Sequence, residues 1–421
     1  MNKLGIITYY WPPAGGPGVQ RWLKLSKYLA DQGVEVYVVT VDEHKATYPL
    51  QDESLRRDVH PNIHVVRTST SEQFGTYQKV TGKKQVPFSG FSGEDAQPSL
   101  VQKVARFVRG NFFFPDARKG WNKHAYAAAS KLIREGDVKH WITTSPPHST
   151  QLVGRKLKRN FDIHWVADFR DPWTDIYYYK LFYPTALVRR IEASMEKSVF
   201  QGCDTLLSVS PSWSALYAQK GEMSMNKVHT LTNGFDAQDF EGITPSRPER
   251  FTITYAGTLA GQYPVEHFVA ALNRVEAPVT VQIIGSWDKA SEEKFANVPN
   301  NVAVEWKGYM SKSALNTYLV NSHCMLFLLP NVESSAGHIP GKLFDYLGGG
   351  NPILGLGPTK GDAATIIAQA DAGKVFDYTD HRGVASFITA LQKKAPRTEP
   401  SKISQFERSN QAAVLAKLLF S

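Results

Sequence analysis

Two series of strand-like segments alternate with helix-like segments along this chain of 421 residues. The first series occupies roughly the first half, and the second begins after a stretch at 240–250 in which Gly, Pro, Arg and Glu crowd together. Strands that alternate with helices favour parallel sheets with helices on both faces. A chain of this length also exceeds one ordinary hydrophobic core. The pattern therefore predicts an α/β protein with two domains.

The predicted fold is a pair of Rossmann-like parallel-sheet domains that face a central cleft, with domains at 1–243 and 250–400. Ligands of such sheets bind outside the carboxyl ends of the strands. We expect a helix at 401–421 that crosses back onto the first domain, and a loop or lid at 69–98. The expected strands are 4–9, 34–41, 63–67, 140–144, 164–168, 205–210, 227–232, 251–256, 279–284, 302–306, 324–329, 352–356 and 374–376, with helices at 19–32, 121–134 and 186–201.

Composition narrows the function classes. Hydrophobic residues make up 42% and charged residues 21%, which is typical of a folded protein. Cys203 and Cys324 lie far apart and fit small buried hydrophobes in a reducing compartment. No apolar run approaches a membrane span and no leader segment is evident, so we expect a cytoplasmic protein. The net charge of +9 comes with no nucleic-acid-binding motif, so nucleic acid is not an expected partner.

A basic amphipathic segment lies at 98–114. Leu100, Val101, Val104, Phe107 and Val108 follow helical spacing, with Lys103, Arg106 and Arg109 between them and an aromatic triplet after them. Such a helix could contact an anionic membrane surface, which would make the protein peripheral on the inner face of the cell membrane. It could equally pack on its own domain, and the sequence leaves both interpretations open.

A glycine-rich loop follows the first strand and opens the first helix. Gly15, Gly16 and Gly18 allow a ligand to approach the backbone, and the helix amides can receive an anion. The spacing is not the GxGxxG of dinucleotide-binding proteins. Asp42 is the only nearby acid that could bind a dinucleotide ribose, so a dehydrogenase is disfavoured.

Further polar residues follow the fourth and fifth strands of the first series. His148 could donate a hydrogen bond to a sugar hydroxyl if its imidazole is neutral. In the segment 168–173, Asp171 could orient an acceptor hydroxyl and Trp173 could stack on a sugar face. Asp168 is more consistent with a structural role. Because the carboxyl ends of parallel strands share one edge of a sheet, these residues are candidates for one site.

The second series carries a loop-helix element with the chemistry of a sugar-nucleotide site. It runs from Gly337 to Tyr346, directly after the strand expected at 324–329. The helix start offers backbone N–H groups to phosphates, Lys342 adds a positive charge, and Asp345 could hold a ribose diol. Earlier in this half, Gly257 and Gly285 follow strands and would let a diphosphate or a base approach. The turn at 233–236 fits a plain turn.

The order of these elements resembles the family 4 retaining glycosyltransferases of the GT-B fold over nearly the whole chain. The shared features are the Gly15–Gly18 loop, His148, an Asn-Gly-x-Asp turn at 233–236, Tyr-x-Gly at 255–257, Ile-x-Gly at 283–285 and a late acidic helix. The resemblance implies a nucleotide-sugar donor bound mainly by the second domain. It also implies transfer with retention and no essential metal or other cofactor.

The resemblance assigns residues to three roles. The catalytic residues are expected to be His148, Asp171 and Lys342. The donor is expected to contact Gly16, Gly257, Thr258, Gly285, His338, Ile339, Pro340, Gly341, Lys342, Leu343 and Asp345. The acceptor, a glycan or lipid-linked saccharide, is expected to contact Gly18, Arg170 and Trp173.

Two positions depart from the family pattern. Many members carry Glu-x7-Glu, and aligning Asp345 with the second acid places Gly337 at the first, so the hexose contact must come from amides or His338. Members also often carry Arg and Lys after the Gly-x-Leu of the second domain, where this chain has Ala260, Gly261 and Gln262. Lys342 is expected to take over the phosphate role. The segment 340–346 is similar to the Pro-x-Lys-x-x-Glu-Tyr signature of enzymes that build cell-surface polysaccharides, with Asp for Glu.

The sequence therefore predicts a retaining glycosyltransferase that moves a sugar, most simply from a UDP-sugar, to an acceptor in cell-surface glycan assembly. Two alternatives remain open. A nucleotide-sugar 2-epimerase shares the architecture, although the cleft acids expected of it are not evident. A non-catalytic nucleotide-sugar-binding subunit would explain the two departures.

Overall fold

The computed structural model describes residues 2–71, 99–332 and 335–420. These residues divide into two compact units. Unit 1 contains 2–71, 99–232 and 411–420, and unit 2 contains 233–332 and 335–410. The division between Thr232 and Asn233 lies before the linker expected at 240–250. Most of the loop or lid expected at 69–98 falls at 72–98, outside the described residues.

Unit 1 is built on a seven-stranded parallel sheet in the order β3-β2-β1-β4-β5-β6-β7. Its central strand, β1, pairs with β2 on one side and β4 on the other, so that Ile6 lies between Val38 and Ile142. The strands are rich in β-branched and aromatic residues, which suit a buried pleated surface. They are β1 Lys3–Ile7, β2 Glu35–Val41, β3 Ile63–Thr68, β4 His140–Ser145, β5 His164–Phe169, β6 Thr205–Ser208 and β7 Val228–Thr230.

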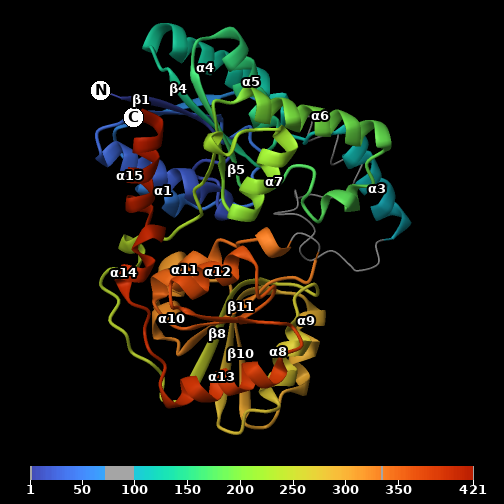
Figure 1. Cartoon of the computed structure of the whole chain (residues 1–421), viewed down its shortest axis with the longest axis vertical. Coiled ribbons are helices and arrows are strands. Elements are labelled where there is room, and N and C mark those ends of the chain that lie inside the picture. The colour runs from blue at the N-terminus through green and yellow to red at the C-terminus, as the bar shows by residue number, and fades with distance from the viewer. Residues whose placement is uncertain (1, 72–98, 333–334, 421) are drawn as a thin grey trace. The chain divides into compact units, whose positions relative to one another are not determined.

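Helices cover both faces of this sheet (Figure 1). On one face, α4 to α7 enclose an aromatic core that includes Trp121, Trp165 and Tyr217. On the other face, Trp22 and Leu23 of α1 pack with Leu415 of α15. The helices of unit 1 are α1 Pro17–Asp31, α3 Leu100–Phe112, α4 Asn122–Gly136, α5 Ser149–Asn160, α6 Ala186–Gly202, α7 Pro211–Gly221 and α15 Arg408–Phe420, with 3-10 turns η1 Glu53–Asp58, η2 Lys119–Trp121, η3 Tyr179–Phe182 and η4 Met225–Lys227.

Unit 2 has a six-stranded parallel sheet in the order β10-β9-β8-β11-β12-β13. Its strands are β8 Phe251–Leu259, β9 Val279–Trp287, β10 Val302–Gly308, β11 Cys324–Leu328, β12 Ile353–Leu356 and β13 Gly373–Phe376. Its helices are α8 Val265–Leu272, α9 Lys289–Lys294, α10 Lys312–Asn321, α11 Lys342–Gly349, α12 Asp362–Gln369, α13 His381–Lys393 and α14 Pro400–Ile403, with 3-10 turns η5 Ala237–Phe240, η6 Phe295–Asn297, η7 Ser335–Gly337 and η8 Ser404–Phe406. Separate apolar cores fill its two faces, one around Phe268 of α8 and one around Phe344 of α11.

All thirteen expected strands are present, and the prediction of two Rossmann-like parallel sheets is confirmed. The largest differences are at strand ends. Strands β8 and β9 extend to Leu259 and Trp287, beyond the expected ends, because their ladder continues through the pair Gly257 and Gly285. The helix expected at 401–421 is interrupted: α14 and η8 precede α15, and Glu407 has extended backbone dihedrals.

Candidate functional site

The expected site residues of unit 1 gather where β1, β4 and β5 end. Strands β4 and β5 run in register up to the pair Ser145 and Phe169, so the segments that follow them leave the same edge of the sheet. Helix α1 starts close by, because the guanidinium of Arg170 reaches the Gly18 carbonyl at 2.6 Å. Residues from three distant parts of the sequence therefore meet at one edge, as the strand order predicts.

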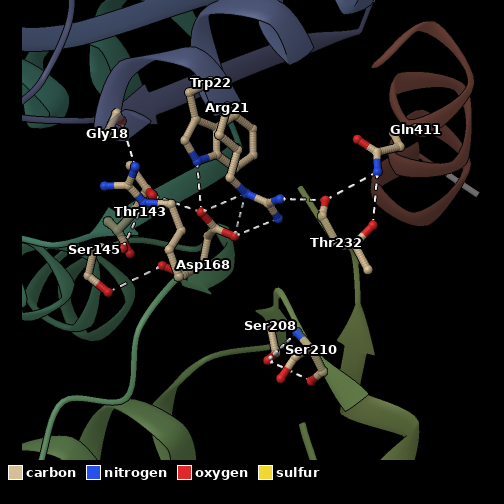
Figure 2. A network of polar contacts seen from close by, with 12 residues as sticks. Gly18, Arg21, Trp22, Thr143, Ser145, Asp168, Ser208, Ser210, Thr232 and Gln411 are labelled. Atoms are coloured by element: carbon tan, nitrogen blue, oxygen red, sulfur yellow. Dashed lines mark hydrogen bonds and ion pairs between the residues drawn. The ribbon is translucent and has the colours of Figure 1, made fainter. Parts of the chain in front are cut away.

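A buried polar network fixes the end of β5 (Figure 2). Asp168 is fully buried and accepts hydrogen bonds from Arg21 and from the Trp22 indole at 2.8 Å. The Arg21 guanidinium also donates to the Thr232 carbonyl at 2.9 Å. A buried carboxylate is tolerated only when its charge is paired and its oxygens are hydrogen-bonded, and both conditions are met. The structural role expected for Asp168 is confirmed.

Arg170 joins the start of α1 to the end of β4 and the loop that follows β4. Its side chain donates to the carbonyl oxygens of Gly18, Ser145 and Pro146 at 2.6, 2.9 and 2.9 Å. These bonds use all three guanidinium nitrogens on backbone acceptors. We expected Arg170 to bind the acceptor; in the structure it holds the loop that leads to His148 and the start of α1 in place.

His148 is held in an aromatic slot. Its ring stacks on Trp173 at 5.3 Å between centroids and 10° between planes, and it also lies 6.2 Å from Phe169. Its Nδ1 atom is buried and has no hydrogen-bond partner among the described residues. Burial, with a smaller contribution from Arg170, lowers the pKa of His148 to about 3. The imidazole is therefore neutral at physiological pH, a state in which one ring nitrogen can donate a hydrogen bond and the other can accept one.

Asp116, which no motif in the sequence marks, holds the backbone next to His148. His148 occupies the N-cap position of α5 but makes no side-chain cap. Asp116 takes that place from another segment: its carboxylate accepts from the Ser149 backbone N–H at 2.7 Å and from the Ser149 hydroxyl at 2.9 Å. A negative charge is stabilised at the positive end of a helix dipole. This contact also satisfies one of the backbone N–H groups that are free at the start of α5.

The loop after β5 is anchored by two buried acids on α6. Glu192 accepts from the Trp173 indole N–H at 3.2 Å and from the Tyr179 hydroxyl at 2.6 Å. Glu196 accepts from the Thr174 hydroxyl at 2.8 Å and pairs with Lys220. Neither acid was predicted as a site residue, because in sequence both are ordinary members of an amphipathic helix.

Trp173 is only 2% exposed, so its ring supports His148 and offers no face to a sugar, contrary to our expectation.

Asp171 and Gly16 lie at the start of this loop and of α1. Burial raises the pKa of Asp171, and the neighbouring Arg170 charge opposes that shift. Asp171 is partly exposed, so it can still meet a ligand. Gly16 has φ 85°, a conformation that a side chain would strain, and it forms the N-cap of α1.

In unit 2, Gly257 and Gly285 form a direct contact between β8 and β9. Both have positive φ, 124° and 123°. A Cβ atom at Gly285 would lie 2.3 Å from the Gly257 carbonyl oxygen, so no side chain fits there. Beyond this pair, the hydroxyls of Thr258 and Ser286 are 3.1 Å apart, and Thr258 is exposed. The two strand ends therefore present bare backbone and hydroxyl groups, the surface that a close ligand needs.

Lys342, the first residue of α11, sits in an aromatic cage beside this glycine pair. Its Nζ lies 3.9 Å from the Tyr255 ring centroid and 5.3 Å from that of Tyr263, and it donates to the Tyr255 hydroxyl at 2.7 Å. A Cβ placed on Gly257 would be 3.9 Å from this Nζ. Within the described part of the chain no carboxylate pairs with Lys342. Burial lowers the pKa of Lys342 to about 7. In its protonated form this lysine would offer an incoming anion a cation that no carboxylate already neutralises.

The loop 337–341 and the rest of α11 divide into core and exposed positions. Ile339 and Leu343 are 5% and 0% exposed and belong to the core of unit 2, so only their backbone atoms could contact a donor. Burial, with the nearby charge of Lys342, lowers the pKa of His338 to about 4. Pro340 and Gly341 are partly exposed, and Gly341 is the N-cap of α11.

Asp345 already has a partner. Its carboxylate forms an ion pair with Lys312, the first residue of α10, and both side chains are about one-third exposed. We expected Asp345 to hold a ribose, and this pairing leaves one carboxylate oxygen for that purpose. Tyr346, the next residue, is fully buried and bridges to the Ala256 backbone N–H at 2.8 Å, which ties α11 to the end of β8.

Comparison with known proteins agrees with this architecture. Residues 15–234, just over half of the chain, match the family described as glycosyl transferase 4-like domain, and the chain therefore belongs to that family. The prediction of a glycosyltransferase of the GT-B fold is thereby confirmed. No curated protein matches the sequence.

Solved structures share the fold at low sequence identity. The lipopolysaccharide outer core galactosyltransferase WaaB in its apo form has a TM-score of 0.59 at 12% identity, covering 100% of this chain and 99% of WaaB. A glycosyltransferase from Rickettsia africae has a TM-score of 0.58 at 10% identity, covering 99% and 97%. Anabaena HepE, in complex with UDP and glucose, has a TM-score of 0.57 at 11% identity, covering 100% and 96%.

The described residues contain no group of three or more His, Cys, Asp or Glu side chains arranged to hold a metal ion. In the same residues, every helix is too short or too polar to cross a bilayer. The charged group beside the glycine pair of unit 2 is Lys342, and the polar groups at the strand ends of unit 1 include His148 and the partly exposed Asp171.

Proposed function

We propose that the chain transfers a sugar from a nucleotide diphosphate sugar to a glycan or lipid-linked saccharide acceptor, with retention at the anomeric carbon and without a metal. The observation that carries this proposal is the position of Lys342. Its ammonium group has no carboxylate partner in the described chain and lies beside the bare backbone of Gly257 and Gly285. A diphosphate is the ligand that such a pocket of amides and one ammonium group favours.

The ammonium group of Lys342 could also support catalysis. As the bond from the anomeric carbon to the phosphate oxygen breaks, negative charge grows on the diphosphate, and a nearby ammonium group stabilises that charge. The arriving diphosphate also favours the protonated form of Lys342, because an anion raises the pKa of a neighbouring amine. This charge can serve where other glycosyltransferases use a metal ion.

Acceptor activation is assigned to unit 1. In the proposed reaction the acceptor oxygen bonds to the anomeric carbon while its proton passes to the departing phosphate oxygen, so no side chain is an obligate base. Neutral His148 and Asp171 would orient the sugars by hydrogen bonds. We expect His148→Phe, which keeps the stacking on Trp173 but removes both ring nitrogens, to lower the rate by about tenfold to a hundredfold.

The donor is proposed to be a UDP-sugar. Support comes from HepE, which shares the fold and whose structure contains UDP and glucose. WaaB, another structure with this fold, is a lipopolysaccharide outer core galactosyltransferase, which supports a role in cell-surface glycan assembly.

Attachment to the membrane surface is proposed through α3. Leu100, Val101 and Val104 on this helix are 80%, 77% and 62% exposed, and Ser99 begins it with a capping box. Lys103 is exposed on the same helix, whereas Arg106 is buried. The other side of α3 packs on its own unit, since Arg109 lies 4.6 Å from the Phe182 ring centroid. The packed side fits the interpretation that α3 belongs to its own domain. The exposed apolar side supports our proposal that a cytoplasmic protein is held at the inner face of the membrane.

One assay separates the candidate functions. The protein is incubated with UDP-sugars, with and without a crude lipid acceptor, and the products are identified. Release of UDP that depends on acceptor, with a new glycoside, supports transfer. An isomerised UDP-sugar would instead indicate a 2-epimerase, and binding without turnover would indicate a non-catalytic subunit. Lys342→Gln should reduce donor binding and turnover, whereas the exposed control Lys360→Gln should not.

A further inference from the structure

A basic groove in unit 1 is lined mainly by residues of α4 and α5. Its volume is about 640 Å³, which is within the range of small-molecule sites. The lining combines cations with an aromatic ring, two amides and two aliphatic side chains. These residues are Lys119, Asn122, Lys123, Tyr126, Leu152, Val153, Arg155, Lys156, Arg159 and Asn160.

The groove gathers positive charge without compensation. Five of its lining residues are Lys or Arg and none is acidic. Among the described residues, none of these five cations forms an ion pair with a carboxylate. Arg155 and Arg159 lie one helical turn apart, and burial together with the charge of Arg159 lowers the pKa of Arg155. Like charges at this spacing destabilise a helix, and Lys123 lies in the first turn of α4, where the helix dipole disfavours a cation.

The lining is organised as well as charged. Lys156 lies 4.3 Å from the Tyr126 ring centroid, and the Asn160 amide donates to the Tyr126 hydroxyl at 2.9 Å. Arg155 is held from behind by the Ser198 hydroxyl. The Tyr126 ring is thus held by Asn160 and packs against the Lys156 ammonium group. The hydrogen bond to Ser198 holds the guanidinium of Arg155 in one orientation. A solvated patch of separate lysines would lack these contacts.

We propose that this groove binds an anion that carries two or more phosphate charges. Guanidinium groups pair with phosphate oxygens through two parallel hydrogen bonds, and ammonium groups add point charges around them. A bound diphosphate would relieve the repulsion among the five cations. The groove shares no residue with the glycine pair and Lys342 of unit 2, and it does not depend on the proposed transfer of sugar.

The test measures binding of inorganic pyrophosphate to the whole protein by titration calorimetry. The site variant is the triple change Lys123→Gln, Lys156→Gln and Arg159→Gln, all at exposed positions where folding should persist. The matched control removes the same charge from a second groove, in unit 2, through Arg274→Gln, Arg382→Gln and Lys393→Gln. Each protein is also measured with Lys342→Gln, so that binding at the unit 2 site is counted separately.

We expect a pyrophosphate site that survives Lys342→Gln, is weakened at least about tenfold by the groove variant and is unaffected by the control. Raising the salt concentration should weaken it further. If both triple variants weaken binding equally, the effect is one of net charge and the proposal is wrong. The same holds if Lys342→Gln abolishes all binding. Vesicles containing phosphatidylglycerol form a second arm: binding to them alone, with none to pyrophosphate, would overturn the proposal in favour of a lipid surface.

Discussion

Burial favours the neutral form of three basic side chains at the candidate site. It lowers the pKa values of His148, His338 and Lys342 to about 3, 4 and 7. A neutral imidazole in each unit leaves Lys342 as the one of these three groups whose charge changes near physiological pH. Perturbed pKa values of this kind cluster at functional sites.

The buried charge of Lys342 should therefore lower the free energy of unfolding by an amount that depends on pH. Its folded pKa lies below the value of about 10.4 expected for an unfolded chain, so the unfolded state binds the extra proton between pH 7 and 10. Stability consequently rises with pH across that window. We expect Lys342→Met to raise the melting temperature relative to wild type by a few degrees at pH 6 and by less at pH 9, where about 1 kcal/mol corresponds to 2–4 °C.

Thermal unfolding at several pH values checks this expectation. The exposed residue Lys360 gives the matched control Lys360→Met, which should show no such trend. A melting temperature that falls equally at pH 6 and pH 9 in Lys342→Met would show that the contacts with Tyr255 and Tyr263 outweigh the burial of the charge.

Sequence reasoning at this scale identified residue types better than their surroundings. It located Lys342 at the start of a helix because glycine and proline precede it and an amphipathic pattern follows. The aromatic cage escaped notice, because Tyr263 lies about 80 residues earlier and only the fold brings it near. Trp173 was wrongly expected to face a sugar, because a sequence does not reveal that a buried glutamate binds its indole nitrogen.

Among the structural elements, the loop between β5 and α6 depends most on a few side chains. Glu192 holds Trp173 against His148, and burial raises the pKa of Glu192 despite its hydrogen bonds. Replacement by Leu removes two acceptor bonds, each worth about 1.5–3 kcal/mol when one partner is charged. We expect Glu192→Leu to lower the melting temperature and to reduce activity by freeing Trp173.

Glu192→Gln separates charge from shape. An amide keeps an acceptor for the Trp173 indole but carries no charge. The pKa of Glu192 is raised in the folded protein. Its protonated form therefore contributes stability that is fully present below the usual pKa of a glutamate and is lost as pH rises through the folded pKa. The Gln variant should therefore gain melting temperature relative to wild type at pH 7.5 more than at pH 4.5. Equal differences at both pH values would contradict the role assigned to burial.

The ends of β8 and β9 give a second element-scale prediction. At Gly285 an added Cβ would meet the Gly257 carbonyl at 2.3 Å, and φ is 123°. We expect Gly285→Ala to destabilise unit 2 by about 1–3 kcal/mol and to weaken donor binding. Gly261→Ala is the matched control, since its added Cβ would lie 3.6 Å from Asp288, an ordinary contact. Calorimetric unfolding of both variants measures the difference, and equal losses would count against the strand-end contact.

At the scale of the whole molecule, the C-terminal helix matters because its buried face belongs to unit 1. Ala412, Leu415 and Leu419 of α15 are at most 4% exposed and join the core under α1. Leu415→Ala should destabilise unit 1 by about 2–5 kcal/mol, as for other buried leucines. Val414, its neighbour on the same helix, is 60% exposed, so Val414→Ala should change stability by less than about 0.5 kcal/mol.

Differential scanning calorimetry with limited proteolysis checks this prediction. In Leu415→Ala, cleavage sites within unit 1 should open at a lower temperature while those of unit 2 keep their wild-type temperature. A parallel loss in both units would mean that they unfold as one cooperative body.

The fold was predictable at this scale because each buried parallel strand is a short apolar run bounded by turn residues. Thirteen such runs gave thirteen strands. The order of strands in each sheet, and the point where the chain leaves unit 1, depend on contacts between distant segments and could not be predicted from local pattern. The predicted boundary relied on the Gly- and Pro-rich stretch at 240–250, whereas the division lies at Thr232.

The contact between Thr232 and Gln411 has a practical consequence. The chain departs from unit 1 at Thr232 and rejoins it at Gln411, and the Gln411 amide lies 3.2 Å from both the carbonyl and the hydroxyl of Thr232 (Figure 2). Unit 2 is thus an insertion whose entry and exit are already joined by hydrogen bonds on its host. A short Gly-Ser splice from 232 to 411 would close the host without it, and two junctions at those positions would allow a whole module to be grafted from a relative.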